Sequence, residues 1–185
     1  MRAFLAIPLP AALVASAAAA ARTIAGDERE WRLARDEGLH VTLRFLGEVD
    51  RAVLSALEAP VAEATRATPG LTLVLRDAGA FPSVRRPRIL WLGVEDRSTG
   101  GVLAALAAQF EDAARAAGLI HEARPFFPHV TLARARTDRA RCSALETVGT
   151  LGTFDPAEVV LFRSILGRGG ARYEIERRFP VGRMP

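Results

Sequence analysis

Two of the three histidines in this chain stand in the same tetrapeptide, HVTL. His40 begins the segment HVTLRFLG, and His129 begins the segment HVTLARAR. Alternate side chains of a β-strand share a face, so His40 shares a face with Thr42, and His129 shares one with Thr131. Each copy therefore offers an imidazole and a hydroxyl about 6–7 Å apart along its strand, both aimed at the same space.

If two such strands face a common site, their polar groups suit a phosphodiester. One imidazole can take a proton from the attacking oxygen, the other can give a proton to the departing oxygen, and the hydroxyls can hold the non-bridging oxygens. Histidine serves both purposes because its ordinary pKa of about 6.5 allows either protonation state near neutral pH. One histidine in a strand is more often structural than catalytic, but two copies with the same hydroxyl partner favour catalysis.

Other chemistries fit the sequence less well. His121 could join His40 and His129 as the third nitrogen ligand of a zinc site. The repeated motif lacks a matched carboxylate and His121 lies outside it, so we expect neither a metal nor another cofactor. The chain has no Gly-x-Ser-x-Gly motif and no lysine for a phosphate-binding glycine loop, which excludes nucleophile-elbow hydrolases and P-loop nucleotide-binding proteins.

The charge and the cysteine content suggest a partner and a compartment. All 25 basic residues are arginines, the formal net charge is +4, and arginines cluster at residues 83–88, 133–141 and 176–183. Such a surface would suit an anionic partner such as RNA, although most charged runs are simply solvated. The single cysteine, Cys142, has no partner for a disulfide, which favours a reducing compartment, and we expect a cytoplasmic protein.

The first 26 residues can be interpreted in two ways. Their basic start, apolar middle and small residues are typical of a secretory signal peptide. Alternating apolar residues at 4–9, with Pro8 and Pro10, instead favour a buried strand followed by a helix that ends at Gly26. We expect the second arrangement. No run of about 20 apolar residues occurs elsewhere, so we expect no membrane-spanning segment.

Periodicity and turn residues predict the elements that would position the two motifs. Asp50 would cap a helix that has one apolar face. The proline-rich segment 79–87 is typical of a loop, and the GRGG sequence at 167–170 is typical of a hairpin turn. The predicted strands are 4–9, 30–34, 40–46, 71–78, 88–95, a strand behind Pro128, 157–166 and 171–179, and the predicted helices are 10–26, 50–68, 98–119 and 138–148.

The repeated motifs resemble the H-x-T-x motifs of the 2H phosphoesterase superfamily. The wider match resembles its bacterial and archaeal RNA 2′,3′-cyclic phosphodiesterase branch, also called 2′-5′ RNA ligase. The segments that carry it are RAFLAIPLP, GLHVTLRFLGEV, GAFPSVRRPRILWLGV, FFPHVTLARAR and LFRSILGRGGARYEI, which together span nearly the whole chain. The resemblance implies an α+β fold, in which residues 1–185 form one domain of two intertwined, pseudo-symmetric lobes. Each lobe would supply antiparallel strands, outer helices and one H-x-T-x motif to a central cleft.

The resemblance also implies roles for particular residues. His40 would be the proton donor to the leaving 3′ oxygen, and His129 would be the proton acceptor that activates water. Thr42 and Thr131 would hydrogen-bond the phosphoryl oxygens. Arg134 is a further candidate for phosphate binding, although strand parity places it on the opposite face unless the strand bends.

Further polar and aromatic residues are candidates for a role in the site or in the core. Strand parity places Arg44 on the histidine face, where it could cap the rim of the cleft. Aromatic rings could stack a terminal base, and the candidates are Phe81, Phe126 and Phe127. Three further aromatic residues are interpreted as structural, namely Trp31, Trp91 and Tyr173.

The predicted activity is hydrolysis of RNA 2′,3′-cyclic phosphate ends, which leaves a 2′-phosphate and needs no metal. The alternatives are ATP-independent 2′-5′ RNA ligation at the same site and an RNA-binding module without turnover. The partner would be RNA with a cyclic phosphate end, such as a tRNA fragment, or a small cyclic nucleotide. We expect a monomer.

Overall fold

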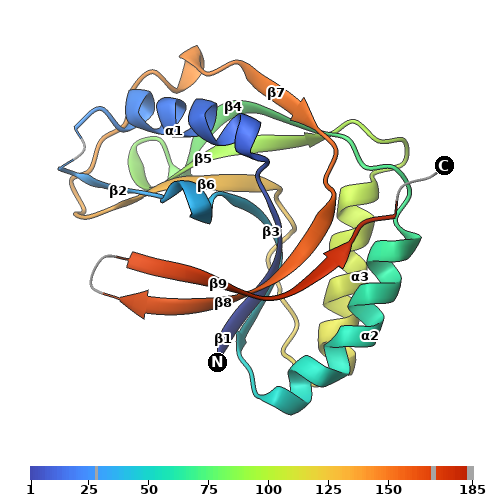
Figure 1. The fold of residues 1–185 in the computed structure, drawn as a ribbon. Coiled ribbons are helices and arrows are strands. Elements are labelled where there is room, and N and C mark those ends of the chain that lie inside the picture. The colour runs from blue at the N-terminus through green and yellow to red at the C-terminus, as the bar shows by residue number, and fades with distance from the viewer. Residues whose placement is uncertain (28, 168–169, 183–185) are drawn as a thin grey trace.

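The computed structural model describes residues 1–27, 29–167 and 170–182, and these form one curled antiparallel sheet with three α-helices (Figure 1). The strands are β1 Arg2–Pro8, β2 Trp31–Leu33, β3 His40–Glu48, β4 Leu73–Ser83, β5 Arg86–Asp96, β6 His129–Ala135, β7 Thr150–Phe154, β8 Glu158–Gly167 and β9 Gly170–Pro180. The helices are α1 Ala11–Ala25, α2 Arg51–Ala67 and α3 Val102–Ala116, with short 3₁₀ turns η1 Asp36–Gly38 and η2 Leu145–Thr147.

The strand order is β7-β4-β5-β6-β3-β1-β8-β9, and β2 pairs with β6 beside this path. The two strands that carry the HVTL motifs, β3 and β6, are neighbours at the centre, where Val41 pairs with Val130. Outward from this pair, β5, β4 and β7 follow on one side and β1, β8 and β9 on the other. The predicted α+β class, antiparallel strands with outer helices, is confirmed.

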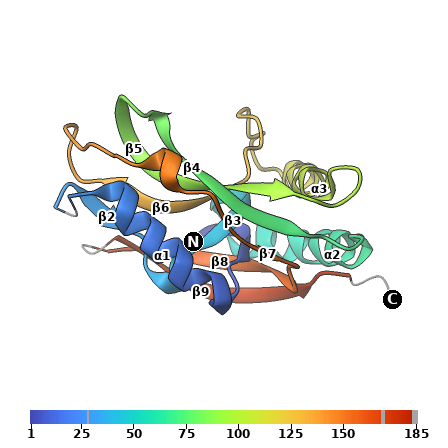
Figure 2. The same cartoon turned by 90° about the horizontal axis from the view of Figure 1, so that it is seen from above.

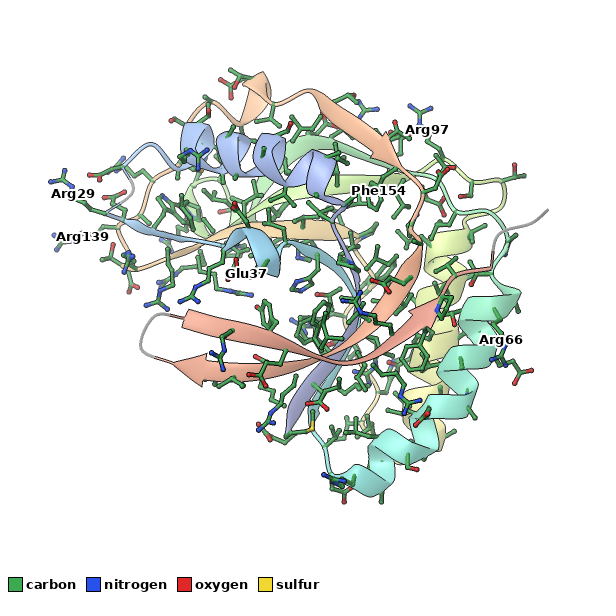
Figure 3. All side chains as sticks on the ribbon, viewed as in Figure 1. Arg29, Glu37, Arg66, Arg97, Arg139 and Phe154 are labelled. Carbon is green, nitrogen blue, oxygen red and sulfur yellow. The ribbon has the colours of Figure 1, made fainter. Side chains whose placement is uncertain are left out.

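The two faces of the sheet have different surroundings. The outer face packs against the helices and holds the main core, to which Leu5, Val41 and Val130 contribute. Figures 1 and 2 show α2 and α3 side by side and α1 across the β4–β7 side of the sheet, and Figure 3 shows side chains between the helices and the strands. The inner face carries a smaller cluster around Phe4 and Phe162, which involves no helix residue. The inner face thus carries a smaller apolar cluster than the outer face.

The first 26 residues form a strand and then a helix, as predicted. β1 lies inside the sheet, where it pairs with β3 on one side and β8 on the other, and Ala3 to Ile7 are buried. α1 ends before Gly26, whose φ of 64° suits a residue without a side chain. Among the described residues, no helix is long and apolar enough to cross a membrane.

The predicted helix at 138–148 is wrong. The chain there is irregular apart from η2, and the strand β7, which was not predicted, follows it. Contacts with distant residues hold this backbone in place: Trp31 Nε1 donates to the Arg141 carbonyl at 2.8 Å, and the Arg141 N–H donates to a Glu30 carboxylate oxygen at 2.9 Å. Such tertiary contacts override local helix propensity. Cys142, which lies in this segment, is a free, half-buried thiol.

The predicted loop at 79–87 is also wrong, because β4 and β5 continue through most of it. Their register runs out to Ser83 opposite Arg86, so only residues 84 and 85 connect the strands. Pro82 and Pro87 are paired with each other in this ladder. Prolines lack an N–H donor and are tolerated near the end of a hairpin. The two central residues of the predicted GRGG turn lie outside the described residues, and its first and last residues, Gly167 and Gly170, are paired with each other.

Candidate active site

The two HVTL motifs lie side by side on the inner face of the sheet. β3 and β6 are antiparallel, and Val41 lies opposite Val130. One residue away from this pair in each direction, His40 therefore lies opposite Thr131, and Thr42 lies opposite His129. Val41 and Val130 are fully buried on the outer face, so the histidines and threonines point to the inner one. The structure thus brings these four predicted site residues together, and the residues of one strand are related to those of the other by an approximate two-fold axis.

Both imidazoles are oriented in the same way. Nδ1 of His40 lies 2.7 Å from the Gly38 carbonyl oxygen, and Nδ1 of His129 lies 2.7 Å from the Phe127 carbonyl oxygen. A carbonyl oxygen can only accept a hydrogen bond, so Nδ1 carries the proton in both rings. Nε2 of each ring is therefore the nitrogen that can take up or release a proton at the site.

A β-bulge in each motif strand changes the face on which later residues lie. In β3, Thr42 pairs with Ala6 and Arg44 pairs with Leu5, which leaves Leu43 as the extra residue. An extra residue reverses the alternation of faces beyond it. Arg44 therefore points to the outer face and is buried, contrary to the prediction from strict alternation.

The second bulge has the opposite consequence for Arg134. In β6, Thr131 pairs with Trp91 and Ala133 pairs with Leu90, so Leu132 is the extra residue. Arg134 consequently returns to the histidine face, where its charge lowers the pKa of both His40 and His129. The prediction placed Arg134 on the face opposite the histidines in a regular strand, and β6 is not regular because of the bulge at Leu132. In β3, the place equivalent to Arg134 is taken by Phe45, which is 49% exposed.

Each histidine is surrounded by aromatic rings. The ring of His40 lies 4.8 Å from Phe4, 5.9 Å from Phe162 and 5.2 Å from Tyr173, measured between ring centroids. The ring of His129 lies 5.2 Å from Phe81 and 5.9 Å from Phe127. Two of the three predicted stacking residues are thus beside His129.

The third candidate and the structural aromatic residues have different positions. Phe126 packs against the main core, and the structure does not bring it to the histidines. Trp31 is buried, as its structural interpretation implied. Trp91, in contrast, lies 5.3 Å from Phe81 and 5.1 Å from Phe127, and its indole covers Gly79, where a Cβ atom would overlap the indole ring. Trp91 and Tyr173 therefore belong to the surroundings of the site, which their sequence context did not indicate.

The pKa of both imidazoles is lowered. Burial among the aromatic rings is the main cause for His40, whose pKa falls to about 4, with smaller effects from the charges of His129 and Arg134. Burial likewise lowers the pKa of His129, with a further contribution from Arg134. Phe127 beside His129 is 48% exposed, whereas Phe4 and Phe162 beside His40 are buried, so His129 is the more open of the two. Both rings are therefore neutral at pH 7 in the free protein.

His121 does not join the other two histidines. Its Nδ1 lies 2.7 Å from a carboxylate oxygen of Glu111 on α3, and the other oxygen of Glu111 lies 2.5 Å from Nε of Arg44. In the part of the chain that the structure describes, no group of three or more His, Cys, Asp or Glu side chains could hold a metal ion.

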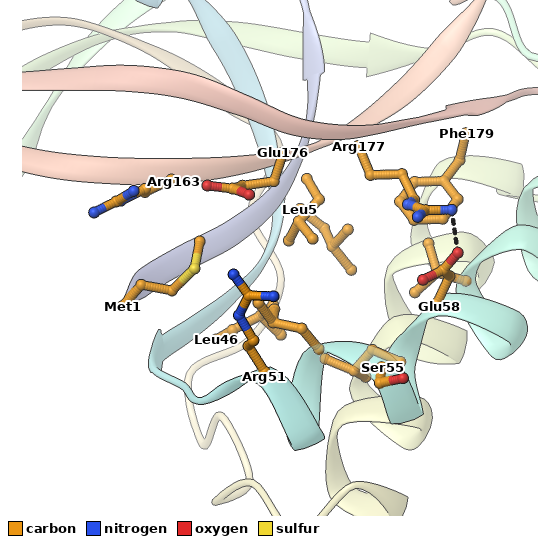
Figure 4. A pocket seen from close by; sticks show the side chains of 14 residues that line it. Met1, Leu5, Leu46, Arg51, Ser55, Glu58, Arg163, Glu176, Arg177 and Phe179 are labelled. Carbon is orange, nitrogen blue, oxygen red and sulfur yellow. Dashed lines mark ion pairs between the residues drawn. The ribbon is translucent and has the colours of Figure 1, made fainter.

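A pocket of about 450 Å³ lies on the other side of the sheet (Figure 4). It is lined by α2 and by strands β1, β8 and β9, with Leu5 and Leu161 among its apolar residues and Arg51 and Arg163 among its charged ones. Leu5 belongs to the main core on the outer face, so this pocket is separate from the histidine pair.

Comparisons with known proteins agree with this geometry. The family model for LigT like Phosphoesterase matches residues 7–91. An RNA 2′,3′-cyclic phosphodiesterase of Methanothermobacter thermautotrophicus is 30% identical over 94% of this chain and 95% of its own. A crystal structure of a Thermus thermophilus protein has a TM-score of 0.83 at 27% identity, covering 98% of both chains. Escherichia coli LigT complexed with 3′-AMP has a TM-score of 0.76 at 32% identity, covering 97% of both chains.

Proposed function

The chain belongs to the LigT-like phosphoesterase family, and on that premise we propose that it hydrolyses RNA 2′,3′-cyclic phosphate ends to 2′-phosphomonoesters. The observation that carries this proposal is the pairing of the two HVTL strands, which sets two imidazoles and two hydroxyls on one face. Relatives named RNA 2′,3′-cyclic phosphodiesterase support the reaction, and a relative crystallised with 3′-AMP supports a ribonucleotide end as the substrate.

In the proposed mechanism the two imidazoles divide the proton transfers. Nε2 of His129 accepts a proton from water as the water oxygen attacks phosphorus. The bond from phosphorus to the 3′ oxygen breaks, and Nε2–H of His40 gives its proton to that oxygen. The hydroxyls of Thr42 and Thr131 and the guanidinium of Arg134 hold the non-bridging oxygens, where negative charge builds up in the transition state. No metal or nucleotide cofactor takes part.

The surroundings of the two rings support this division of roles. Water must reach the base, and His129 lies beside the exposed ring of Phe127. His40 lies among the buried rings of Phe4 and Phe162, where an imidazolium is costly in the free protein. A bound phosphodiester anion stabilises that imidazolium, so His40 is charged mainly when substrate is present.

This arrangement predicts a particular dependence on pH. The reactive state needs His40 protonated and His129 neutral, and the free protein has a His40 pKa of about 4 and a His129 pKa below its usual value. Above pH 6.5 we therefore expect kcat/KM to fall about tenfold per pH unit, because less His40 is protonated. The decline in kcat should begin at higher pH, because bound phosphate raises the pKa of His40. Rates measured between pH 4 and 9 test this, and a kcat/KM that rises from pH 6.5 to 8 would contradict it.

The reaction itself is tested with a defined RNA end. The protein is incubated with chelator and an oligonucleotide that ends in a 2′,3′-cyclic phosphate, and the product is identified by mass and by its resistance to 3′-specific phosphatase. Release of a 2′-phosphate supports the proposal. Binding without turnover would indicate an RNA-binding module, and activity that appears only with added zinc would indicate a metal site. Joining of added 5′-hydroxyl RNA in place of hydrolysis would indicate a ligase.

We propose in addition that residues 1–185 act as one monomeric domain. The strand order, which divides at the β6–β3 pair into two groups of four, supports two lobes that share a sheet. The group of β3, β1, β8 and β9 combines the two ends of the chain, because β8 pairs with β1. Neither half of the chain could complete this lobe without the other.

A further inference from the structure

Two arginines are cross-strand neighbours on the inner face of the sheet. Arg32 on β2 is the cross-strand partner of Arg134 on β6, so both side chains lie on the same face. Like charges directly opposite in a sheet are unfavourable. Within residues 1–27, 29–167 and 170–182, neither guanidinium is within ion-pair distance of a carboxylate. An anion between or beside them would remove this repulsion.

The side chain of Arg32 extends away from β6 toward the β8–β9 hairpin. A Cβ atom at Gly170, the first residue of β9, would lie 3.2 Å from Arg32 Cδ and 3.9 Å from Arg32 Nη1. Figure 1 shows β2 opposite this end of the hairpin, and Figure 3 shows Arg139 at the same end of the molecule. An RNA strand that extends from the histidine pair toward this hairpin would reach Arg134 first and Arg32 next.

We propose that Arg32 forms, beside Arg134, a second phosphate subsite that binds the phosphate on the 5′ side of the terminal nucleotide. The inference rests on the proposed function, in which Arg134 holds the reactive cyclic phosphate. A guanidinium binds a phosphodiester through two parallel hydrogen bonds, and two anions then face two cations. The site would therefore favour ends of RNA strands and 5′-phosphorylated nucleotides over nucleoside 2′,3′-cyclic phosphates, which have no 5′ phosphate.

The test compares two substrates that differ only at the 5′ position, adenosine 2′,3′-cyclic phosphate and its 5′-phosphorylated form. We expect the wild type to have the higher kcat/KM for the second. Arg32→Gln should lower kcat/KM for the 5′-phosphorylated substrate about tenfold, the effect of losing one charge-assisted contact, and leave the other substrate within about twofold. Arg32→Lys should keep part of the preference. Arg163→Gln removes the same charge at the pocket on the outer side and should change neither substrate.

The outcomes that overturn the inference are distinct. If Arg32→Gln lowers kcat/KM equally for both substrates, Arg32 acts on the reactive phosphate or on the fold. If Arg32→Gln leaves the preference for the 5′-phosphorylated substrate unchanged, Arg32 does not bind the 5′ phosphate. If the wild type hydrolyses neither substrate, the proposed function fails while the subsite is still tested by calorimetry. Adenosine 2′,5′-bisphosphate should then bind about tenfold more tightly than adenosine 2′-phosphate, and Arg32→Gln should abolish the difference. Equal affinities in the wild type would overturn the subsite.

Discussion

Replacing His129 by alanine is expected to lower kcat by about 10²–10⁴-fold, the usual contribution of a general base, while the protein remains folded. Nε2 of His129 is the nitrogen left to accept the proton of water, because Nδ1 is committed to the Phe127 carbonyl. His40→Ala should cost a similar factor, because Nε2–H of His40 is the proposed proton donor. Turnover of an RNA end with a 2′,3′-cyclic phosphate, with circular dichroism to confirm folding, is the measurement.

The third histidine provides the matched control. His121 is exposed and bound to Glu111, away from the pair, so His121→Ala should keep activity within a few-fold of the wild type. The two site histidines act in one proton transfer sequence, so the double variant should be hardly slower than the slower single variant. Wild-type turnover in either His40→Ala or His129→Ala would remove that residue from the mechanism.

Strand alternation was sufficient to predict which face the histidines and threonines share, because both lie before the bulges. It was insufficient for Arg44 and Arg134, which lie just after them. Each bulge is defined by pairing with a strand distant in sequence, β1 for Leu43 and β5 for Leu132. Nothing within HVTLRFLG or HVTLARAR marks the extra residue. The two arginines therefore exchange faces for a reason that only the assembled sheet contains.

The aromatic surroundings of the site were hidden for a related reason. Phe127 is close to its histidine in sequence and was a natural candidate, and Phe81 belongs to a segment of the family resemblance. Phe162 and Tyr173, in contrast, reach His40 from β8 and β9, more than a hundred residues along the chain. The alternation of residues along β8 and β9 predicts which side chains are buried and which are exposed. It does not predict which residues of other strands those side chains contact. Long-range pairing, which a single sequence does not display, decides that neighbour.

Replacing Glu111 by alanine is expected to lower the free energy of unfolding by about 3–5 kcal/mol, the largest stability effect that we predict. Glu111 on α3 holds the guanidinium of Arg44 on β3 at 2.5 Å, and the two side chains are 18% and 8% exposed. Without Glu111, the buried guanidinium of Arg44 loses its ion-pair partner. Burial alone would raise the pKa of Glu111, but hydrogen bonds from His121 and the Glu122 N–H, with the charge of Arg44, leave it lowered. Urea unfolding at pH 7 measures the loss.

A double variant separates the ion pair from the packing around it. Replacing both partners by apolar residues, Arg44→Met with Glu111→Leu, leaves no unpaired charge and should cost far less than Glu111→Ala. A loss below about 1 kcal/mol in Glu111→Ala would show that water screens the pair as it does at a surface.

The pair also matters for the site, because Arg44 donates hydrogen bonds to the carbonyls of Phe45 and, at 2.7 Å, Ile120. It thereby fixes the backbone just after the bulge, so activity in the folded fraction of the double variant reports whether that backbone keeps Thr42 in place.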